Sequence, residues 1–169
     1  MSESRRLSII NTSLFLLSGV GLVLSIYGYY VEFKLEQEED YTALCDINEH
    51  VSCTKVFKST YAKGFGISSE ESIFNVPNSL YGIPFYSLLA VLSYSSSLTI
   101  NKILISNVTV ANCLTPYLAY LLTFVLHDVC IVCISIYIVN ALLLLMAFKK
   151  QKLLKSTVKD VKNVKLKRK

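Results

Sequence analysis

The stretch ILISNVTVANCLTPYLAYLLTFVLHDVCIVCISIYIVNALLLLMAF, residues 103–148, decides the fold, because it is apolar along almost all of its 46 residues. As one helix it would extend about 70 Å at 1.5 Å per residue, more than twice a hydrocarbon core of about 30 Å. It must therefore turn back on itself. Its one charged residue, Asp128, stands next to His127, so we expect the turn there, with a helix on each side.

Two further stretches without charge precede this one, at residues 7–31 and at about 79–100. Each has the roughly 20 residues that a spanning helix needs. The whole chain of 169 residues is 53% hydrophobic, which exceeds the usual content of soluble domains. The sequence therefore predicts an all-α membrane protein, with a bundle of four transmembrane helices in residues 1–148.

Charge is distributed unevenly between the two ends of this bundle. Residues 32–76 hold nine acidic and four basic residues, whereas residues 149–169 hold ten Lys or Arg and one Asp. Lys and Arg accumulate on the cytoplasmic side of membrane proteins. We therefore expect both termini in the cytoplasm, with 149–169 as a basic tail, and the 32–76 loop and the His127–Asp128 turn on the opposite, lumenal face.

The basic tail has three compatible interpretations. In the first, the tail is a solvated anchor on the cytoplasmic side. In the second, it contacts anionic membrane lipid. In the third, its end, Lys165-Leu166-Lys167-Arg168-Lys169, acts as a retrieval signal, because it is similar to the signal of endoplasmic reticulum membrane proteins. Nucleic-acid binding is not expected, because the positive charge follows a membrane helix and has no aromatic partners.

The loop between the first two helices is rich in glycine and aromatic residues. Gly64 and Gly66 permit backbone angles that other residues avoid, so we expect a turn followed by a short amphipathic helix, residues 67–74, over the helix mouths. The loop aromatics are expected to form a lid at the bilayer interface or to pack on the bundle. They are Phe57, Tyr61, Phe65 and Phe74.

Four of the five cysteines fall on the lumenal face by this topology. Cys45 and Cys53 lie in the loop, where a disulfide would close a small ring and stabilise it by about 2.5 kcal/mol. Cys130 and Cys133 form a C-x-x-C motif at the start of the last helix. We expect Asp128 to cap that helix and the helix dipole to favour the thiolate, which is the species that attacks disulfides.

Helical spacing places further groups beside this motif. Cys130, Cys133, Tyr137 and Asn140 recur at intervals of three and four residues and so share one helix face. Tyr137 is either a hydrogen-bond donor to a ligand or an interfacial aromatic, and Asn140 either serves the ligand or joins two helices. A zinc site on the four cysteines is the alternative, but such sites usually hold two close pairs. Cys113 receives no role.

The segment NVPNSLYGIPFYS opens the second helix. Asn78 is expected at or near the N-cap, at the depth of Cys133, where its amide could also bind a ligand oxygen. Pro84 should bend the helix and leave a pocket lined by Tyr81 and Phe85.

Four motifs in this order, ALCDINEHVSCTKVF, KGFG, NSLYG and HDVCIVCISIY, make residues 7–148 resemble the vitamin K epoxide reductase family in its animal form. The resemblance implies an enzyme of the endoplasmic reticulum membrane with a lumenal cap. It would reduce vitamin K epoxide to the quinone and the quinone to the hydroquinone, in support of γ-carboxylation, with no tightly bound cofactor.

The resemblance also implies residue roles. Cys133 would meet the substrate, and Cys130 would be its resolving partner. Cys45 and Cys53 would be the shuttle pair, with Cys53 exchanging with Cys130 and Cys45 receiving electrons from a thioredoxin-like lumenal partner. The substrate-binding residues would be Asn78 and Tyr137 at the two ends of the quinone ring, and Tyr81, Phe85 and Leu118 along the pocket.

The chain also departs from the family pattern, since it has no Trp, and Tyr81, His127 and Pro84 stand at positions where the animal enzymes usually differ. Two alternatives to the reductase remain open from the sequence. One is a quinone-linked oxidant that forms disulfides in lumenal proteins. The other is a non-enzymatic four-span scaffold with a stapled loop.

Overall fold

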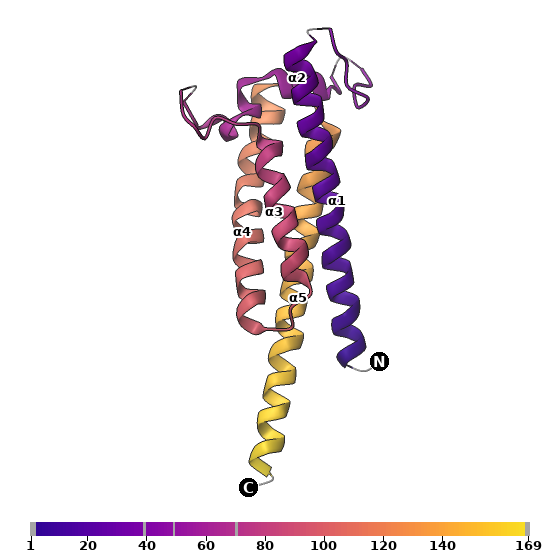
Figure 1. Cartoon of the computed structure of the whole chain (residues 1–169), viewed down its shortest axis with the longest axis vertical. Helices are drawn as coiled ribbons and strands as arrows, with labels where there is room; N and C mark the ends of the chain where they lie inside the picture. The colour runs from indigo at the N-terminus through magenta and orange to yellow at the C-terminus, as the bar shows by residue number, and fades with distance from the viewer. Residues whose placement is uncertain (1–2, 39, 49, 70, 168–169) are drawn as a thin grey trace.

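The computed structural model describes residues 3–38, 40–48, 50–69 and 71–167, and its regular elements there are all helices. They are α1 (Glu3–Gln37), α2 (Cys53–Lys58), η1 (Thr60–Ala62), η2 (Gly64–Gly66), α3 (Asn78–Ser93), α4 (Leu98–Tyr120), η3 (Leu121–Val125) and α5 (Ile131–Lys167). Helices α1, α3, α4 and α5 run side by side, and the loop with α2 lies across one end (Figure 1). The predicted all-α class is confirmed.

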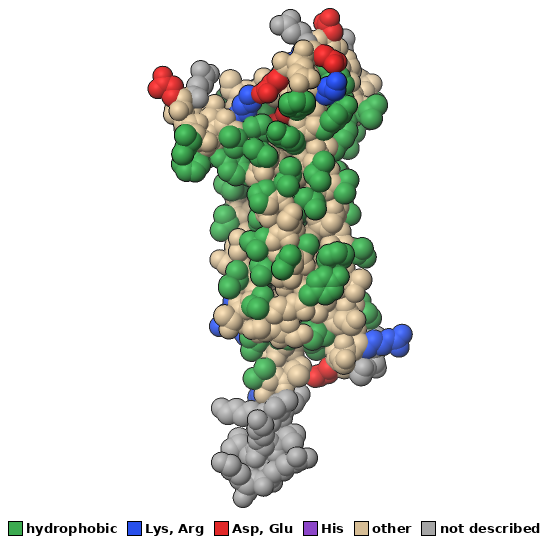
Figure 2. Space-filling model, viewed as in Figure 1, with side chains coloured by type: hydrophobic (Ala, Val, Ile, Leu, Met, Phe, Trp, Pro, Cys, Tyr) green, Lys and Arg blue, Asp and Glu red, His purple; other side chains and the backbone are tan. Residues whose placement is uncertain are grey.

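Within the described residues, three helical segments are long and apolar enough to cross a membrane, namely Glu3–Gln37, Leu98–Val125 and Ile131–Lys159. Helix α3 has 16 residues, fewer than the roughly 20 that usually span a bilayer. Charged side chains gather at the two ends of the visible face, and hydrophobic side chains are spread over the long band between them (Figure 2). The chain is therefore built as a membrane protein.

The predicted boundary between the second and third helices is wrong. Helix α3 ends at Ser93 and α4 begins at Leu98, so the turn lies before residue 100. Lys102, which lies between the two predicted apolar stretches, is an exposed residue inside α4. The turn contains Ser95-Ser96-Ser97, where the Ser97 N–H donates to the Ser95 hydroxyl at 3.2 Å. Serine side chains compete with helical hydrogen bonds in this way.

The expected reversal at His127–Asp128 is confirmed. Helix α4 continues into the π-helix η3, and α5 begins at Ile131. His127 takes a left-handed conformation with φ 55°, which ends the helical path. Single-turn π-helices occur often beside functional sites, and η3 ends shortly before the reversal that leads to the C-x-x-C motif.

Small residues bring α1 close to α3. The buried face of α1 includes Ser18, Gly21, Ser25 and Gly28, a pattern that lets membrane helices approach closely. A Cβ at Gly21 would meet the ring of Tyr86. The packing of these two helices therefore depends on the missing side chain at this position.

Hydrogen bonds between helices also hold the bundle together. The Tyr86 hydroxyl donates to Asn140 Oδ1 at 2.8 Å, which joins α3 to α5, and Asn140 thereby makes the helix–helix contact that was one of its two expected roles. At the opposite end, the buried Lys150 ammonium donates to the Ser93 carbonyl at 2.6 Å. This contact satisfies a carbonyl that the end of α3 leaves free.

The expected amphipathic helix at residues 67–74 is wrong. The described residues of this range form turns and bends, and the short helices of the loop, α2, η1 and η2, all precede it. Gly64, Phe65 and Gly66 have φ values of 53°, 58° and 69°, so the chain winds into a tight turn instead. Ile73 and Phe74 are 85% and 63% exposed and give a helix no buried face. Of the predicted retrieval signal, Arg168 and Lys169 lie outside the described residues.

Candidate active site

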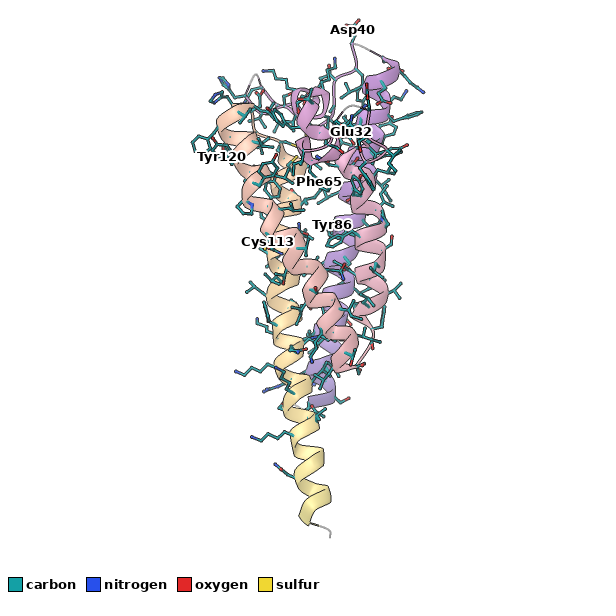
Figure 3. The ribbon with its side chains drawn as sticks, turned by 90° about the vertical axis from the view of Figure 1, so that its left-hand side faces the viewer. Glu32, Asp40, Phe65, Tyr86, Cys113 and Tyr120 are labelled. Atoms are coloured by element: carbon teal, nitrogen blue, oxygen red, sulfur yellow. A yellow bond between two sulfur atoms is a disulfide. The ribbon has the colours of Figure 1, made fainter. Side chains whose placement is uncertain are left out.

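The two cysteine pairs meet at the loop end of the bundle. Cys45 and Cys53 form a disulfide, and Cys130 and Cys133 are free thiols. The Cys130 sulfur lies 3.9 Å from the Cys53 sulfur. The structure thus brings the four predicted cysteines together. Cys113 lies away from them, exposed on α4 (Figure 3).

Backbone hydrogen bonds tie the loop to the residue before Cys130. The Ser52 N–H donates to the Val129 carbonyl at 3.0 Å, and the Val129 N–H donates to the His50 carbonyl at 2.8 Å. Ser52 also caps α2, where its hydroxyl accepts the Lys55 N–H at 3.1 Å. Since Cys53 and Cys130 each follow one of these paired residues, the pairing sets their sulfurs opposite each other.

Asp46 fixes the ring that the disulfide closes. Its carboxylate accepts the Thr54 N–H at 3.0 Å, and the Thr54 hydroxyl accepts the Ala43 N–H at 3.0 Å. Burial opposes ionisation of Asp46, but the hydrogen bonds, those from Thr54 first, outweigh it and hold the pKa of this carboxyl below its ordinary value. The charged form therefore stabilises this conformation of the loop.

Cys130, and not Asp128, occupies the N-cap of α5. The Cys130 carbonyl accepts the Ile134 N–H at 3.0 Å, and its sulfur accepts the Cys133 N–H at 3.3 Å. Asp128 instead lies 3.5 Å from the Lys55 ammonium. The hydrogen bond from the Cys133 side chain, followed by backbone N–H groups of the helix start, lowers the pKa of the Cys130 thiol. The start of α5 thereby stabilises negative charge on the Cys130 sulfur.

Cys133 faces a cavity of about 400 Å³ between the helices. This volume lies in the range of small-molecule sites. All five residues predicted to bind a substrate line the same cavity. They are Asn78, Tyr81, Phe85, Leu118 and Tyr137. The structure therefore brings the predicted site residues together around one thiol, while their roles toward a substrate remain predictions.

Asn78 is the first residue of α3, and Pro77 takes the N-cap position. Its amide is used by the loop instead, since Oδ1 accepts the Phe65 N–H at 2.7 Å and Nδ2 donates to the Tyr61 carbonyl at 2.8 Å. An amide NH₂ group has two donors, so one N–H of Asn78 is left for another acceptor at the cavity.

Tyr81 also fastens the loop over the cavity. Its hydroxyl donates to the Phe74 carbonyl at 2.8 Å, and its ring stacks on Phe65 with centroids 5.2 Å apart. Phe57, Tyr61 and Phe65 line the cavity, whereas Phe74 points away from the core, 63% exposed. Three of the four loop aromatics therefore close one end of the cavity.

The sequence analysis missed Glu32 and Tyr86, both of which line the cavity. Tyr86 lies deep among the helices, and Glu32 lies on α1 near its loop end (Figure 3). The signal for Glu32 was present, because it is the first charged residue after the uncharged stretch 7–31. It was counted only as part of the acidic loop.

A metal site at the loop cysteines would involve Cys45, Asp46 and Cys53, whose ligand atoms lie within 4.8 Å of one another. The two sulfurs are joined in the disulfide, and the Asp46 carboxylate is engaged by Thr54. Metal ligation by cysteine requires thiolates. The donor set in this conformation therefore does not fit a zinc ion.

Comparison with known proteins places these residues in a wider group. The profile of the "Vitamin K epoxide reductase family" matches residues 12–148. The chain is 43% identical over 136 residues to "Vitamin K epoxide reductase complex subunit 1" of Rattus norvegicus, an alignment that covers 77% of this chain and 83% of the rat protein. Identity to the Mus musculus protein of the same name is 37% over 134 residues, with the same coverage. The profile match contains the four clustered cysteines and every predicted substrate-binding residue.

Proposed function

Because the chain belongs to the vitamin K epoxide reductase family and is thus an oxidoreductase, we propose that it reduces vitamin K 2,3-epoxide to the quinone and the quinone to the hydroquinone, in support of γ-carboxylation. The observation that carries the proposal is that the two cysteines of the C-x-x-C pair face different surroundings. Cys130 faces the loop disulfide at 3.9 Å, and Cys133 faces the cavity.

The electron relay runs through the loop pair. In the proposed sequence, a Cys53 thiolate attacks Cys130 of an oxidised Cys130–Cys133 pair and releases Cys133. Cys45 then attacks Cys53 and releases Cys130. This leaves an oxidised loop pair and a reduced C-x-x-C pair, which is the combination in the structure.

We propose that an external thioredoxin-like protein delivers electrons at Cys45. Exposure supports this choice, because Cys53 is fully buried and Cys45 is partly exposed. Attack on a disulfide needs access to one sulfur, and only Cys45 offers it. Oxidation of lumenal thiols and reduction of the quinone are two halves of one exchange, so the disulfide-forming alternative differs in physiological purpose and not in chemistry.

At the cavity, we propose that the Cys133 thiolate attacks the quinone ring, with its oxygens bound by Asn78 at one end and Tyr137 at the other. The remaining donor of Asn78 and the phenol of Tyr137 suit carbonyl oxygens. Tyr81, Phe85 and Leu118 would contact the apolar parts of the substrate. A lipid-soluble quinone would enter from the membrane lipid.

The proposed topology has four spanning helices in the endoplasmic reticulum membrane, with both termini cytoplasmic and the loop with its cysteines lumenal. It is supported by three apolar helices of spanning length and by the basic tail. The fourth, α3, is short but packs between α1 and α4. After reduction of the loop disulfide, thiol labelling of Cys45 from the two sides of sealed microsomes tests this orientation.

The decisive experiment combines an activity with a trap. Purified protein with a dithiol reductant should convert vitamin K epoxide to the quinone, detected by chromatography. The double variant Cys45→Ala/Cys133→Ala should form a Cys53–Cys130 disulfide under mild oxidation, because these two sulfurs have lost their other partners. Failure of the wild-type conversion would refute the activity, and absence of the trapped disulfide would refute the relay.

A further inference from the structure

Glu32 is a buried carboxyl group with one free oxygen at the cavity. The residue is 4% exposed, and one oxygen, Oε2, accepts the hydroxyl of Ser79. The other oxygen, Oε1, is buried and has no hydrogen-bond partner among the described residues. Buried polar atoms are rarely left unpaired. An unpaired carboxyl oxygen beside a ligand cavity is therefore a candidate contact for the ligand.

Glu32 also lines a second cavity of about 500 Å³ under the loop. Phe57 and Ser59 line both cavities with it, so Glu32 stands in the partition between them. The second cavity is the more polar of the two, and its wall includes Glu36, Lys58, Thr60, Lys63 and Asn75. One carboxyl group thus connects the space that holds Cys133 with a polar space at the loop end.

Reduction at Cys133 consumes protons as well as electrons. The other polar groups at the cavity are poor proton donors near neutral pH, since a phenol such as Tyr137 has an ordinary pKa of about 10 and the Asn78 amide does not ionise. Glu32 is the one carboxyl group among the described residues that line the cavity. Its side chain bonds to Ser79, the neighbour of Asn78, so it belongs to the Asn78 end of the site.

We propose that Glu32 is the proton donor of the reaction, passing a proton to the substrate oxygen at the Asn78 end and regaining it through the second cavity. This inference rests on the proposed function and adds a catalytic group to it. Glu32 would donate a proton to any quinone or quinone epoxide that Cys133 attacks.

The chemistry balances for the epoxide. The Cys133 thiolate forms a C–S bond to the ring, one epoxide C–O bond breaks, and the oxygen takes the proton of Glu32. The Cys130 thiolate then attacks the Cys133 sulfur, the S–S bond forms, and the electrons of the broken C–S bond expel the hydroxyl group, which leaves as water with a second proton. Two thiols lose two electrons, and the two protons consumed equal those released when the thiols ionised.

The titratable groups around Glu32 come from five elements of the structure. They are Glu36 on α1, Lys58 on α2, Tyr61 on η1 and Lys63 beside it, Tyr81 and Tyr86 on α3, and Cys133 and Tyr137 on α5. Lys63 is paired with Glu36 at 2.7 Å, and both residues line the second cavity and not the helical cavity. A pH dependence is therefore assigned to Glu32 by comparing the pH profile of wild-type turnover with that of a variant changed at Glu32 alone.

The test is single-turnover reduction of vitamin K epoxide by the prereduced full-length protein, followed from pH 5 to pH 9. Glu32→Gln keeps the shape and the Ser79 contact but cannot donate an acidic proton, and the rate should fall by about 100-fold or more. In the wild-type protein the rate should fall as the pH rises and Glu32 loses its proton. This pH dependence should disappear in Glu32→Gln. Glu38→Gln is the matched control, because Glu38 is exposed and pairs only locally with Lys34 at 3.0 Å, and it should leave the rate unchanged.

Folding is controlled by a second pair of variants, Glu32→Asp and Glu32→Asn. The two differ only in the acidic proton, so Asp should retain measurable turnover and Asn should not, even if both are less stable than wild type. A Glu32→Gln rate within twofold of wild type, or a raised KM with unchanged kcat, would overturn the proposal. If wild type itself fails to reduce the epoxide, the proposed function fails and not this inference alone.

Discussion

The two cysteine pairs are held in opposite ways. The loop pair is fixed by a disulfide and by hydrogen bonds within a short ring, whereas the C-x-x-C pair is fixed by the start of a long helix packed in the bundle. In each pair one sulfur is fully buried and the other is not. The two buried sulfurs, of Cys53 and Cys130, face each other.

This difference shows how an electron relay between two cysteine pairs can be shielded from thiols in solution. In the proposed relay, exchange between the pairs would take place where both sulfurs are inaccessible to solvent, so external thiols could not intercept it. The accessible members, Cys45 and Cys133, face different environments, one the surface and the other the cavity. The arrangement thus suits the proposed relay, in which the pairs exchange electrons with each other inside the protein and with separate partners at the surface and in the cavity.

The largest effect should come from separating the roles of the two outer cysteines. Cys133→Ala should lower dithiol-driven reduction of vitamin K epoxide by at least about 10³-fold, because the attacking sulfur is lost. Cys45→Ala should leave dithiol-driven turnover within a few-fold and abolish turnover driven by a thioredoxin-like protein. Cys113→Ala is the control for cysteine loss. If Cys45→Ala lost turnover equally with the dithiol and with the thioredoxin-like protein, the proposed separation of roles between the two cysteine pairs would be contradicted.

A second change should uncouple the pairs without removing a sulfur. Ser52→Pro deletes the N–H that donates to Val129 and imposes φ near −65° where Ser52 has −141°. The yield of the Cys53–Cys130 disulfide, trapped in the Cys45→Ala/Cys133→Ala background and measured by mass spectrometry, should fall by about tenfold or more. Ser52→Ala keeps the N–H and should trap normally. A normal yield for the proline variant would show that the backbone pairing does not align the sulfurs.

Much of this arrangement could be predicted from the sequence, because length and spacing are strong constraints. A 46-residue apolar stretch had to reverse, and its one charged residue marked the place. The boundary between α3 and α4 was missed, because the stretch 79–100 was taken as one uncharged span although three consecutive serines follow the end of α3 within it. The cap of α5 was assigned to Asp128, since a carboxylate is a common cap, but α5 begins at Ile131 and Cys130 takes the cap position.

Other features depend on packing, which the sequence does not reveal. The Asn78 amide was predicted to cap a helix or bind a ligand, but it holds the Phe65 turn in place. Glu32 was counted with the acidic loop, and only the assembled bundle shows that it is buried between two cavities. The glycines in KGFG predicted a turn, whereas the exposure of Ile73 and Phe74 explains why no helix follows it.

The support of the C-x-x-C pair by the bundle can be weakened directly. Gly21→Ala would place a methyl group against the Tyr86 ring, and overpacking of this kind costs about 1–3 kcal/mol. We expect a lower thermal unfolding midpoint in detergent, with the loop disulfide still intact. Gly19→Ala is the control, because no atom lies within 4 Å of its added Cβ, and it should be neutral or slightly stabilising. Equal midpoints for the two variants would mean that α1 and α3 pack less tightly than described.

The smallest expected effect concerns the loop pair and pH. The pKa of Asp46 is lower in the folded protein than its ordinary value of about 3.9, chiefly because Thr54 donates hydrogen bonds to it against the effect of burial. Its contribution to stability is therefore fully present above that ordinary value and is lost as the pH falls through the lowered folded pKa. Asp46→Asn should cost less than about 1 kcal/mol, since the carboxyl is largely solvated. The difference in unfolding midpoint from wild type should be present at pH 7 and shrink toward pH 3, whereas the exposed Asp40→Asn control should show no such trend. A difference that grows as the pH falls would reverse the assigned role of this carboxylate and leave the disulfide alone to hold the loop.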